Sequence, residues 1–430
     1  MATTSRRLAL IGLFSGALAV YYHFRQLPHA PRPKAEGPTP PTPPTPPATP
    51  PLPVPATATA APAVTPNTHD NPVSAWAFSP SNGLLATGAE ADFEHADDPV
   101  EGVVLWDITR AEPKVRVRVP GGVGLCDQLR RGIRFSSDGA LVAINGHTNG
   151  VFVAKTDSGE LLAEVYLTGS DGPPQALLSE DGESLFVEDY GEQHIGGVVP
   201  ARYNVPAEQV RWLPARSGTL HPVKLTPGAL FVVEDGVLRS ISREDGSVTD
   251  LLSLMDGHRV AARSGRLLAV AGDGVFLADL DAETPLSSYN TFNDVEDFAF
   301  STGSDRVLAL VQAHGQRPAR ATLLSAQGTL RPIDRNLTRI DWLSTPDFLP
   351  AALSPDGAEA LLLGDAGAVE RWGLDPEPAP LASVGRWSGL RGVLWPTPER
   401  AVLIGPTLLV FLEMPSGKVL RTVGFPPGDD

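Results

Sequence analysis

Residues 132–166, GIRFSSDGALVAINGHTNGVFVAKTDSGELLAEVY, contain a complete four-stranded unit that indicates the fold of the chain. Its short apolar runs are separated by turns rich in Ser, Asp, Asn and Gly, which bond their own backbone or tolerate positive φ. An Asn-Gly pair between two such runs is a strong hairpin signal. A meander of this size cannot bury its faces alone, so it must stack against copies of itself. We expect strands at Ile133–Ser136, Ala140–Ile144, Gly150–Lys155 and Leu161–Tyr166.

Similar turn punctuation recurs along the chain, and opening strands lie about 45 residues apart on average, the period of propeller blades. The sequence therefore predicts an all-β fold, a β-propeller of seven or eight four-stranded blades. The chain has eight candidate first strands, which favours eight blades. Seven blades are the alternative, because two of the intervals between these first strands are long. The further openings contain Ala77-Phe78-Ser79-Pro80, Leu177-Leu178-Ser179, Thr226-Pro227-Gly228, Arg263-Ser264-Gly265, Phe298-Ala299-Phe300-Ser301, Ser354-Pro355-Asp356-Gly357 and Val393-Leu394-Trp395-Pro396. Because ring closure protects exposed sheet edges, we expect the C-terminal strand Val419–Val423 to pair beside the N-terminal strand near Val73–Phe78.

Several of these segments resemble degenerate WD repeats over residues 72–424. The resemblance rests on the AFSP and LSPDG openings, on Leu105-Trp106-Asp107 and on Gly257-His258 before a strand. Trp372 keeps the tryptophan but is followed by Gly373 in place of aspartate. The resemblance implies protein binding through loops that vary between blades. It also implies that the hydrogen-bonded tetrad of WD blades is missing from most copies.

Composition excludes some classes of function. The chain holds 34 basic and 50 acidic residues. Five of the basic and two of the acidic residues lie in the first 70 residues. The remaining 29 basic and 48 acidic residues give a net charge of −19, which would repel a nucleic-acid backbone. The single cysteine, Cys126, permits no internal disulfide and rules out a zinc–thiolate cluster. It lies in an apolar setting, and we interpret it as a small buried side chain.

The N-terminal segment, residues 1–24, begins with a short basic stretch and continues with the apolar run Leu8–Phe24. The length of this run, 17 residues, favours an uncleaved membrane anchor. The basic N-terminus would lie inside, and the rest of the chain would lie on the extracytoplasmic, periplasmic side. The alternative is a signal peptide that is cleaved after Ala17-Leu18-Ala19, which would release a secreted protein.

Residues 25–70 form a proline-rich linker, in which 16 of the 39 residues from Pro28 to Pro66 are proline. Proline sustains neither helix nor central strand, so we expect a disordered, stiff spacer. The propeller domain should then occupy residues 71–430.

No sequence motif assigns a catalytic, cofactor or metal site. The acidic stretch around His95 lacks calcium-loop spacing, and a solvated loop or a surface for a basic protein explains it as well. His147 and His258 lie at turn positions, and the chain has no HExxH or GxSxG motif. Lys114, Arg116 and Arg118 alternate with valines, as on the solvent face of an outer strand. With Arg130, Arg131 and Arg134 they could form a basic patch. The acidic residues near His95 are Glu90, Asp92, Glu94, Asp97, Asp98 and Glu101.

These features favour a non-enzymatic protein–protein interaction scaffold, with a monomeric propeller held at the membrane by residues 8–24 on a proline-rich stalk. Its partners would be proteins and not nucleic acid, and no cofactor is expected. The alternative is a propeller enzyme or small-ligand binder that uses the central channel, where carboxylates, histidines or a metal would converge.

Overall fold

The computed structural model describes part of the chain. The described residues are 69, 71–89, 102–119, 123, 132–146, 150–166, 175–179, 181–188, 196–201, 211–212, 221–234, 236–253, 260–264, 267–271, 275–279, 285–289, 295–311, 319–324, 330–338 and 349–425. The chain divides into two units, Met1–Pro51 and Leu52–Asp430, and every described residue belongs to the second. The predicted N-terminal segment and nearly all of the linker therefore lie outside the described residues. Within the described part, no helix has the length and apolar character needed to span a membrane.

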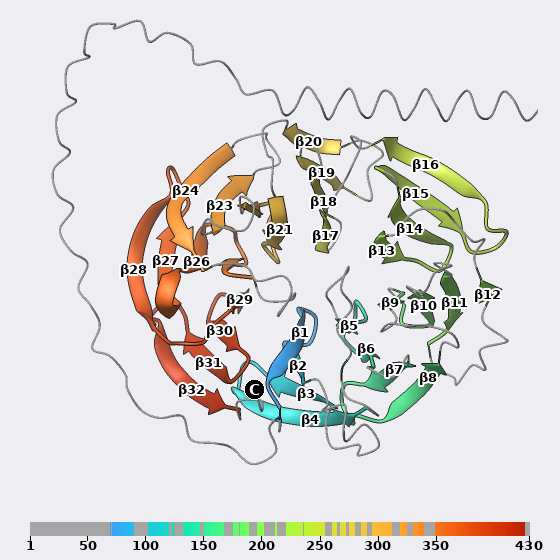
Figure 1. The fold of residues 1–430 in the computed structure, drawn as a ribbon, viewed down its shortest axis with the longest axis horizontal. Coiled ribbons are helices and arrows are strands. Elements are labelled where there is room, and N and C mark those ends of the chain that lie inside the picture. The colour runs from blue at the N-terminus through green and yellow to red at the C-terminus, as the bar shows by residue number, and fades with distance from the viewer. Residues whose placement is uncertain are drawn as a thin grey trace, which may run out of the picture. The chain divides into compact units, whose positions relative to one another are not determined.

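The described strands pair into eight four-stranded sheets, and each sheet is built from four consecutive strands of the chain. Figure 1 shows these sheets, which we call blades, arranged around a ring in chain order, with the first strand of each blade innermost and the fourth outermost. The predicted all-β propeller is confirmed. All neighbouring strands within a blade are antiparallel, as expected for a meander joined by short turns.

The first four blades contain β1 (Val73–Ser79), β2 (Leu84–Ala89), β3 (Gly102–Asp107), β4 (Glu112–Arg118); β5 (Ile133–Phe135), β6 (Leu141–Asn145), β7 (Gly150–Lys155), β8 (Leu161–Tyr166); β9 (Gln175–Leu178), β10 (Ser184–Glu188), β11 (Gly196–Pro200), β12 (Arg211–Trp212); and β13 (His221–Leu225), β14 (Ala229–Glu234), β15 (Val237–Ser242), β16 (Val248–Ser253).

The next four blades contain β17 (Val260–Ser264), β18 (Leu267–Ala271), β19 (Val275–Asp279), β20 (Pro285–Tyr289); β21 (Val295–Phe300), β22 (Val307–Val311), β23 (Ala319–Leu324), β24 (Leu330–Leu337); β25 (Ala351–Leu353), β26 (Glu359–Leu363), β27 (Ala368–Gly373), β28 (Ala379–Arg386); and β29 (Gly392–Thr397), β30 (Arg400–Gly405), β31 (Leu408–Glu413), β32 (Lys418–Gly424). A one-turn 3-10 helix, Asp365–Gly367, precedes β27.

The blade that decided the fold is confirmed strand by strand. β7 and β8 have the predicted bounds, while β5 ends one residue early and β6 is shifted by one residue. The middle strands β6 and β7 are almost entirely buried, whereas the outer strand β8 is buried only at alternate positions. Burial on both faces of the middle strands requires a neighbouring blade on each side, which is the reason why one blade cannot stand alone.

The hydrophobic core lies between blades. In the described residues each of its seven clusters draws side chains from two adjacent blades. One cluster joins the last blade to the first: Val402 and Phe411 pack there with Leu85, Trp106 and other side chains of the first blade. Trp106 and Phe411 have ring centroids 6.0 Å apart.

Ring closure differs from the prediction. Val419–Val423 belongs to β32, the outermost strand of the last blade, and pairs with β31, whereas β1 is the innermost strand of the first blade and pairs with β2. The prediction that these terminal strands lie paired is therefore wrong. Each terminal blade already has four strands of its own, so the ring closes by packing of two complete sheets. A backbone hydrogen bond between the first and last blades, from Val73 N to Pro406 O at 2.7 Å, helps to close it.

The closing cluster generates a prediction. We expect Phe411→Ala to lower the free energy of unfolding by about 3–5 kcal/mol, because it removes a fully buried aromatic ring and leaves a cavity between the last and first blades. Leu381→Ala, at a side chain that is 46% exposed, is the control and should cost about 0.5 kcal/mol or less. Urea unfolding of both variants measures the difference, and equal losses would show that the closing cluster does not hold the ring.

Candidate functional site

In three blades the first and second strands are joined by the same kind of hydrogen-bonded turn, in which Ser and Asp are two residues apart and Gly follows. In the clearest example the Ser354 hydroxyl donates to Asp356 Oδ1 at 2.6 Å, and the same carboxylate oxygen accepts from the Ala358 N–H at 3.0 Å. Gly357 has φ +71°, a backbone conformation that residues with a Cβ atom rarely adopt. Ser136 with Asp138 and Ser179 with Asp181 repeat the first contact at 2.6 and 2.5 Å.

These contacts change the acidity of the turn carboxyls. The Ser354 hydroxyl and then the Ala358 N–H hold the pKa of Asp356 below its ordinary value, since both donate to the charged form. The pKa of Asp181 is lowered in the same way by Ser179 and then by the Glu183 N–H. These carboxylates are therefore bound into the turns in their ionised state.

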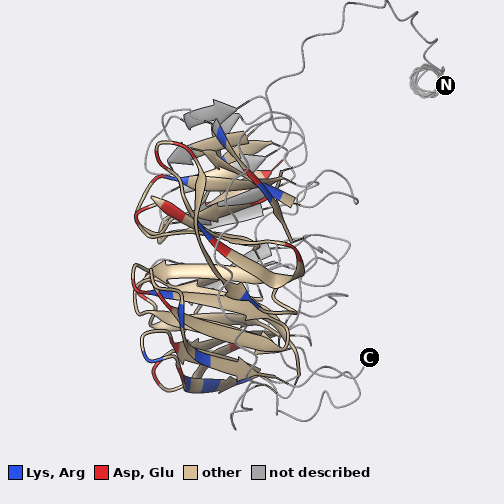
Figure 2. Cartoon of the chain, turned by 90° about the vertical axis from the view of Figure 1, so that its left-hand side faces the viewer, with Lys and Arg blue, Asp and Glu red and all other residues tan. Residues whose placement is uncertain are grey.

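The turns that join the first strand to the second and the third to the fourth must lie at the same end of every blade, because the strands are antiparallel. We call this end the turn face. Figure 2 shows acidic residues along these turns at the left-hand edge of the rim. The exposed acidic residues in or beside the described turns include Glu112, Asp138, Asp157, Glu160, Asp181, Glu183, Glu244, Asp245, Asp305, Asp356, Asp375, Glu377 and Glu399. Exposed acidic residues thus outnumber exposed basic ones, such as Arg110 and Lys418, at the described part of the turn face.

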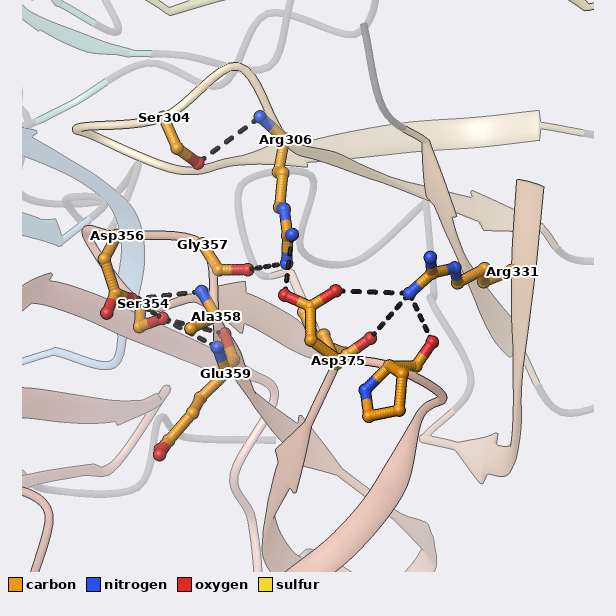
Figure 3. Close-up of polar contacts among 11 residues, drawn as sticks. Ser304, Arg306, Arg331, Ser354, Asp356, Gly357, Ala358, Glu359 and Asp375 are labelled. Atoms are coloured by element: carbon orange, nitrogen blue, oxygen red, sulfur yellow. Dashed lines mark hydrogen bonds and ion pairs between the residues drawn. The ribbon is translucent and has the colours of Figure 1, made fainter. Parts of the chain in front are cut away.

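Charged side chains also tie adjacent blades together at the turn face. Figure 3 shows Asp375, in the turn before β28, held between Arg306 and Arg331 of the preceding blade. The distances are 2.6 Å from Arg306 Nη2 to Asp375 Oδ2 and 3.2 Å from Arg331 Nη1 to Asp375 Oδ1. Arg331 Nη1 also donates to the Leu374 carbonyl at 3.2 Å, and Arg306 Nη1 donates to the Gly357 carbonyl at 2.9 Å.

The same arrangement occurs at the next two blade junctions. Arg371 Nη1 donates to the Pro415 carbonyl in the turn before β32. Arg421 Nη1 donates to the Ala111 carbonyl in the turn before β4 at 3.1 Å, which carries the pattern across the ring closure. In each case an arginine of one blade bonds a carbonyl in the outer turn of the following blade. These hydrogen bonds between blades fix the positions of neighbouring turns relative to one another.

A buried polar trio lies in the first blade. His69 Nε2 is 2.8 Å from Thr87 Oγ1, and Trp106 Nε1–H donates to the same oxygen at 2.8 Å. All three side chains are at most 2% exposed. Sequence reasoning identified Trp106 but missed His69 and Thr87, although the position of His69 just before β1 could have revealed it. In the blade of Trp372 the indole N–H instead donates to Glu370 Oε2 at 3.1 Å.

Few of the sequence candidates can be placed. The acidic stretch Glu90–Glu101 with His95 lies outside the described residues, and so do Cys126, Arg130, Arg131, His147 and His258. Lys114, Arg116 and Arg118 lie on the outermost strand β4, as predicted, with Lys114 and Arg118 exposed and Val117 buried. Arg134 lies on β5, the innermost strand of the next blade, so the structure does not join it to the residues of β4. Among described residues, no three His, Cys, Asp or Glu side chains come together as a metal site would require.

A scan of the sequence against protein-family models finds no match, and a search of curated proteins finds none either. Solved structures do match in fold. The Dos1 propeller is 11% identical, with a TM-score of 0.55 over 84% of this chain and 95% of that one. The chain has a β-propeller fold. Dihydro-heme d1 dehydrogenase NirN is 15% identical, with a TM-score of 0.54 over 87% of this chain and 77% of that one. The computationally designed Ika8 protein is 13% identical, with a TM-score of 0.52 over 84% and 98%. These likenesses establish the fold of the chain.

The hydrogen-bonded turns make stability dependent on pH. Because the folded pKa of Asp181 and Asp356 lies below the ordinary value of 3.8, the unfolded chain takes up protons first as the pH falls. Their stabilisation is complete well above pH 4 and disappears as the pH falls through the folded pKa. We expect Asp356→Asn to reduce the free energy of unfolding at pH 7 and to flatten its decline between about pH 5 and pH 2. Asp365→Asn removes an exposed charge from the same blade and is the control; equal pH profiles for the two variants would contradict the assignment.

The buried trio gives a second prediction. Thr87→Val keeps the shape of the side chain but leaves the Trp106 N–H and His69 without their shared partner, so it should cost about 1–3 kcal/mol of unfolding free energy. Thr322→Val, at a buried threonine on a middle strand of another blade, is the matched control. It should lower the free energy of unfolding by less than half as much. Chemical denaturation followed by tryptophan fluorescence compares them. A loss at Thr87 no larger than that at Thr322 would show that the trio contributes nothing.

Proposed function

We propose that this protein is a non-enzymatic protein–protein interaction scaffold, in which residues 8–24 tether the propeller to the membrane on the proline-rich stalk of residues 25–70. The propeller lies on the extracytoplasmic side in this proposal. It has eight blades, one for each four-stranded sheet of the described residues. The protein partner binds a surface that the blades hold rigid.

The observation that carries the proposal is that these carboxyl and guanidinium groups are engaged in contacts that hold the turns and the blades in place. In the described residues the carboxyls with lowered pKa are engaged in turns by serine hydroxyls and backbone N–H groups. The arginines described above bond carboxylates and carbonyls of the neighbouring blade. Both kinds of contact fix the shape and the charge of an outer surface. A preformed surface of this kind loses little conformational entropy on binding, which favours recognition of a partner.

The test is affinity capture of the tagged full-length chain from crosslinked membranes, beside a chain that lacks residues 1–70. We expect the same discrete protein to co-purify with both, because the propeller carries the binding surface. The full-length chain should be recovered from the membrane fraction and the shortened chain from the soluble fraction.

Three outcomes would count against parts of the proposal. Absence of any specific partner from both captures would overturn the scaffold function and turn attention to small ligands and metals in the central channel. Recovery of a partner only with the full-length chain would assign binding to residues 1–70. A full-length chain that is released from membranes in a shortened form would show a cleaved signal peptide in place of the anchor.

A further inference from the structure

The outermost strands of the blades differ in their proline content. An outermost strand has one edge without a partner in its own blade, and proline on such an edge removes a hydrogen-bond donor and discourages pairing with another chain. β12 is only two residues long, which also limits pairing. β8, β16 and β32 contain no proline and have six, six and seven residues. The outermost strands with a proline carry Pro113, Pro285, Pro332 and Pro380.

The proline-free outer strands also carry exposed apolar side chains. Five of the six large apolar side chains that are strongly exposed in the described residues lie on them: Tyr166 on β8, Val248 and Leu251 on β16, and Val419 and Leu420 on β32. Water contact with these groups is unfavourable, and a partner strand would remove it. Proline-free edges and exposed apolar groups therefore coincide, and each of these three strands has a register shift against its inner neighbour.

β32 differs from the other two proline-free strands in charge. β8 contains Glu164, and β16 contains Asp250, which accepts a hydrogen bond from Arg239 Nε at 2.8 Å. β32 contains Lys418 and Arg421 and no acidic residue. Among described residues, no backbone hydrogen bond outside its own blade reaches Lys418–Gly424. β32 thus presents a basic and apolar edge on a protein of net negative charge.

The neighbouring blade contacts the turn before β32 and carries another exposed apolar side chain. The turn before β32 packs on β28: a Cβ at Gly417 would lie 3.2 Å from Val384 Cγ1, and Arg371 of β27 bonds Pro415 in the same turn. The sixth exposed apolar side chain, Leu381, lies on β28. Figure 1 shows β28 and β32 as neighbours on the outside of the ring.

We propose that the outer edge of β32 binds an extended segment of a protein partner as a fifth strand of the last blade, and that this segment alternates acidic and aliphatic side chains. Backbone hydrogen bonds to the edge would supply affinity, and the side chains of the segment would supply specificity. Its acidic groups face Lys418 and Arg421, of which Arg421 keeps its Nη1 hydrogen bond to the Ala111 carbonyl, and its aliphatic groups cover Val419 and Leu420. The inference rests on the proposed scaffold function and names the kind of partner.

A second copy of the chain fits this edge poorly. In an antiparallel pair of two β32 strands related by two-fold symmetry, Arg421 at the middle of Lys418–Gly424 would face its own counterpart. Like charges directly opposite each other on neighbouring strands are destabilising. The charge pattern therefore favours a different, acidic chain.

The test measures binding of a fluorescently labelled synthetic peptide, seven residues of alternating Glu and Val, to the full-length chain in detergent micelles by fluorescence anisotropy. We expect saturable binding. Two control peptides should bind at least about tenfold more weakly: one with Lys in place of Glu, which reverses the charge, and one with alternate backbone nitrogens methylated, which removes hydrogen-bond donors. Absence of saturable binding, or equal binding of all three peptides, overturns the proposal.

Protein variants locate the site. Leu420→Glu places a negative charge and removes an aliphatic group at the proposed edge, and should weaken the Glu–Val peptide at least about tenfold. Leu251→Glu makes the same change at an exposed leucine of the proline-free strand β16 and should leave binding unchanged. Both side chains are exposed, so both variants should keep the wild-type thermal unfolding midpoint. A loss of binding with Leu251→Glu, or none with Leu420→Glu, contradicts the assignment to β32.

Capture with Leu420→Glu separates this proposal from the scaffold function. If the crosslinked partner of the wild-type chain is lost with Leu420→Glu and kept with Leu251→Glu, the β32 edge is its binding site. If the partner is kept with both variants, the scaffold function stands and the β32 edge is excluded.

Discussion

Packing of each blade between two neighbours is the constraint on which the rest of the structure depends. Middle strands such as β6 and β7 are buried on both faces, so a blade exposed on one side would leave apolar groups in water. A row of blades has two such ends, and only a closed ring has none. The cluster between the last and first blades removes these ends, and the rings of Trp106 and Phe411 pack against each other within it.

Polar contacts then fix the relative positions of adjacent blades more closely than the apolar packing does. Apolar clusters are not directional, so they allow adjacent blades to slide or rotate slightly against each other. Hydrogen bonds from Arg331, Arg371 and Arg421 to turn carbonyls of the next blade are directional and set the position of each outer turn. Turns such as Ser354–Gly357 are in turn held by their own carboxylates. The result is a rigid acidic turn face beside a rim that differs from blade to blade.

Much of the fold could be predicted because its signals are local. Turn residues between apolar runs marked β7 and β8 to the residue, and the same punctuation marked β1, β9, β21 and β25. The position of Lys114, Arg116 and Arg118 on an outer strand also followed from alternation with valines. The buried trio was harder, because Thr87 is one threonine in an apolar strand and only the fold brings it to His69 and Trp106.

The sequence by itself determined the blade, the repetition and the all-β class, since turn chemistry and strand periodicity act between residues close in the chain. Tertiary structure decided how the ring closes, which arginine bonds which turn, and which outer edge stays both proline-free and apolar. Arg421 and Ala111 are joined across a sequence separation of 310 residues. No local pattern specifies such a pair, because their contact depends on the summed rotation of all the blades between them.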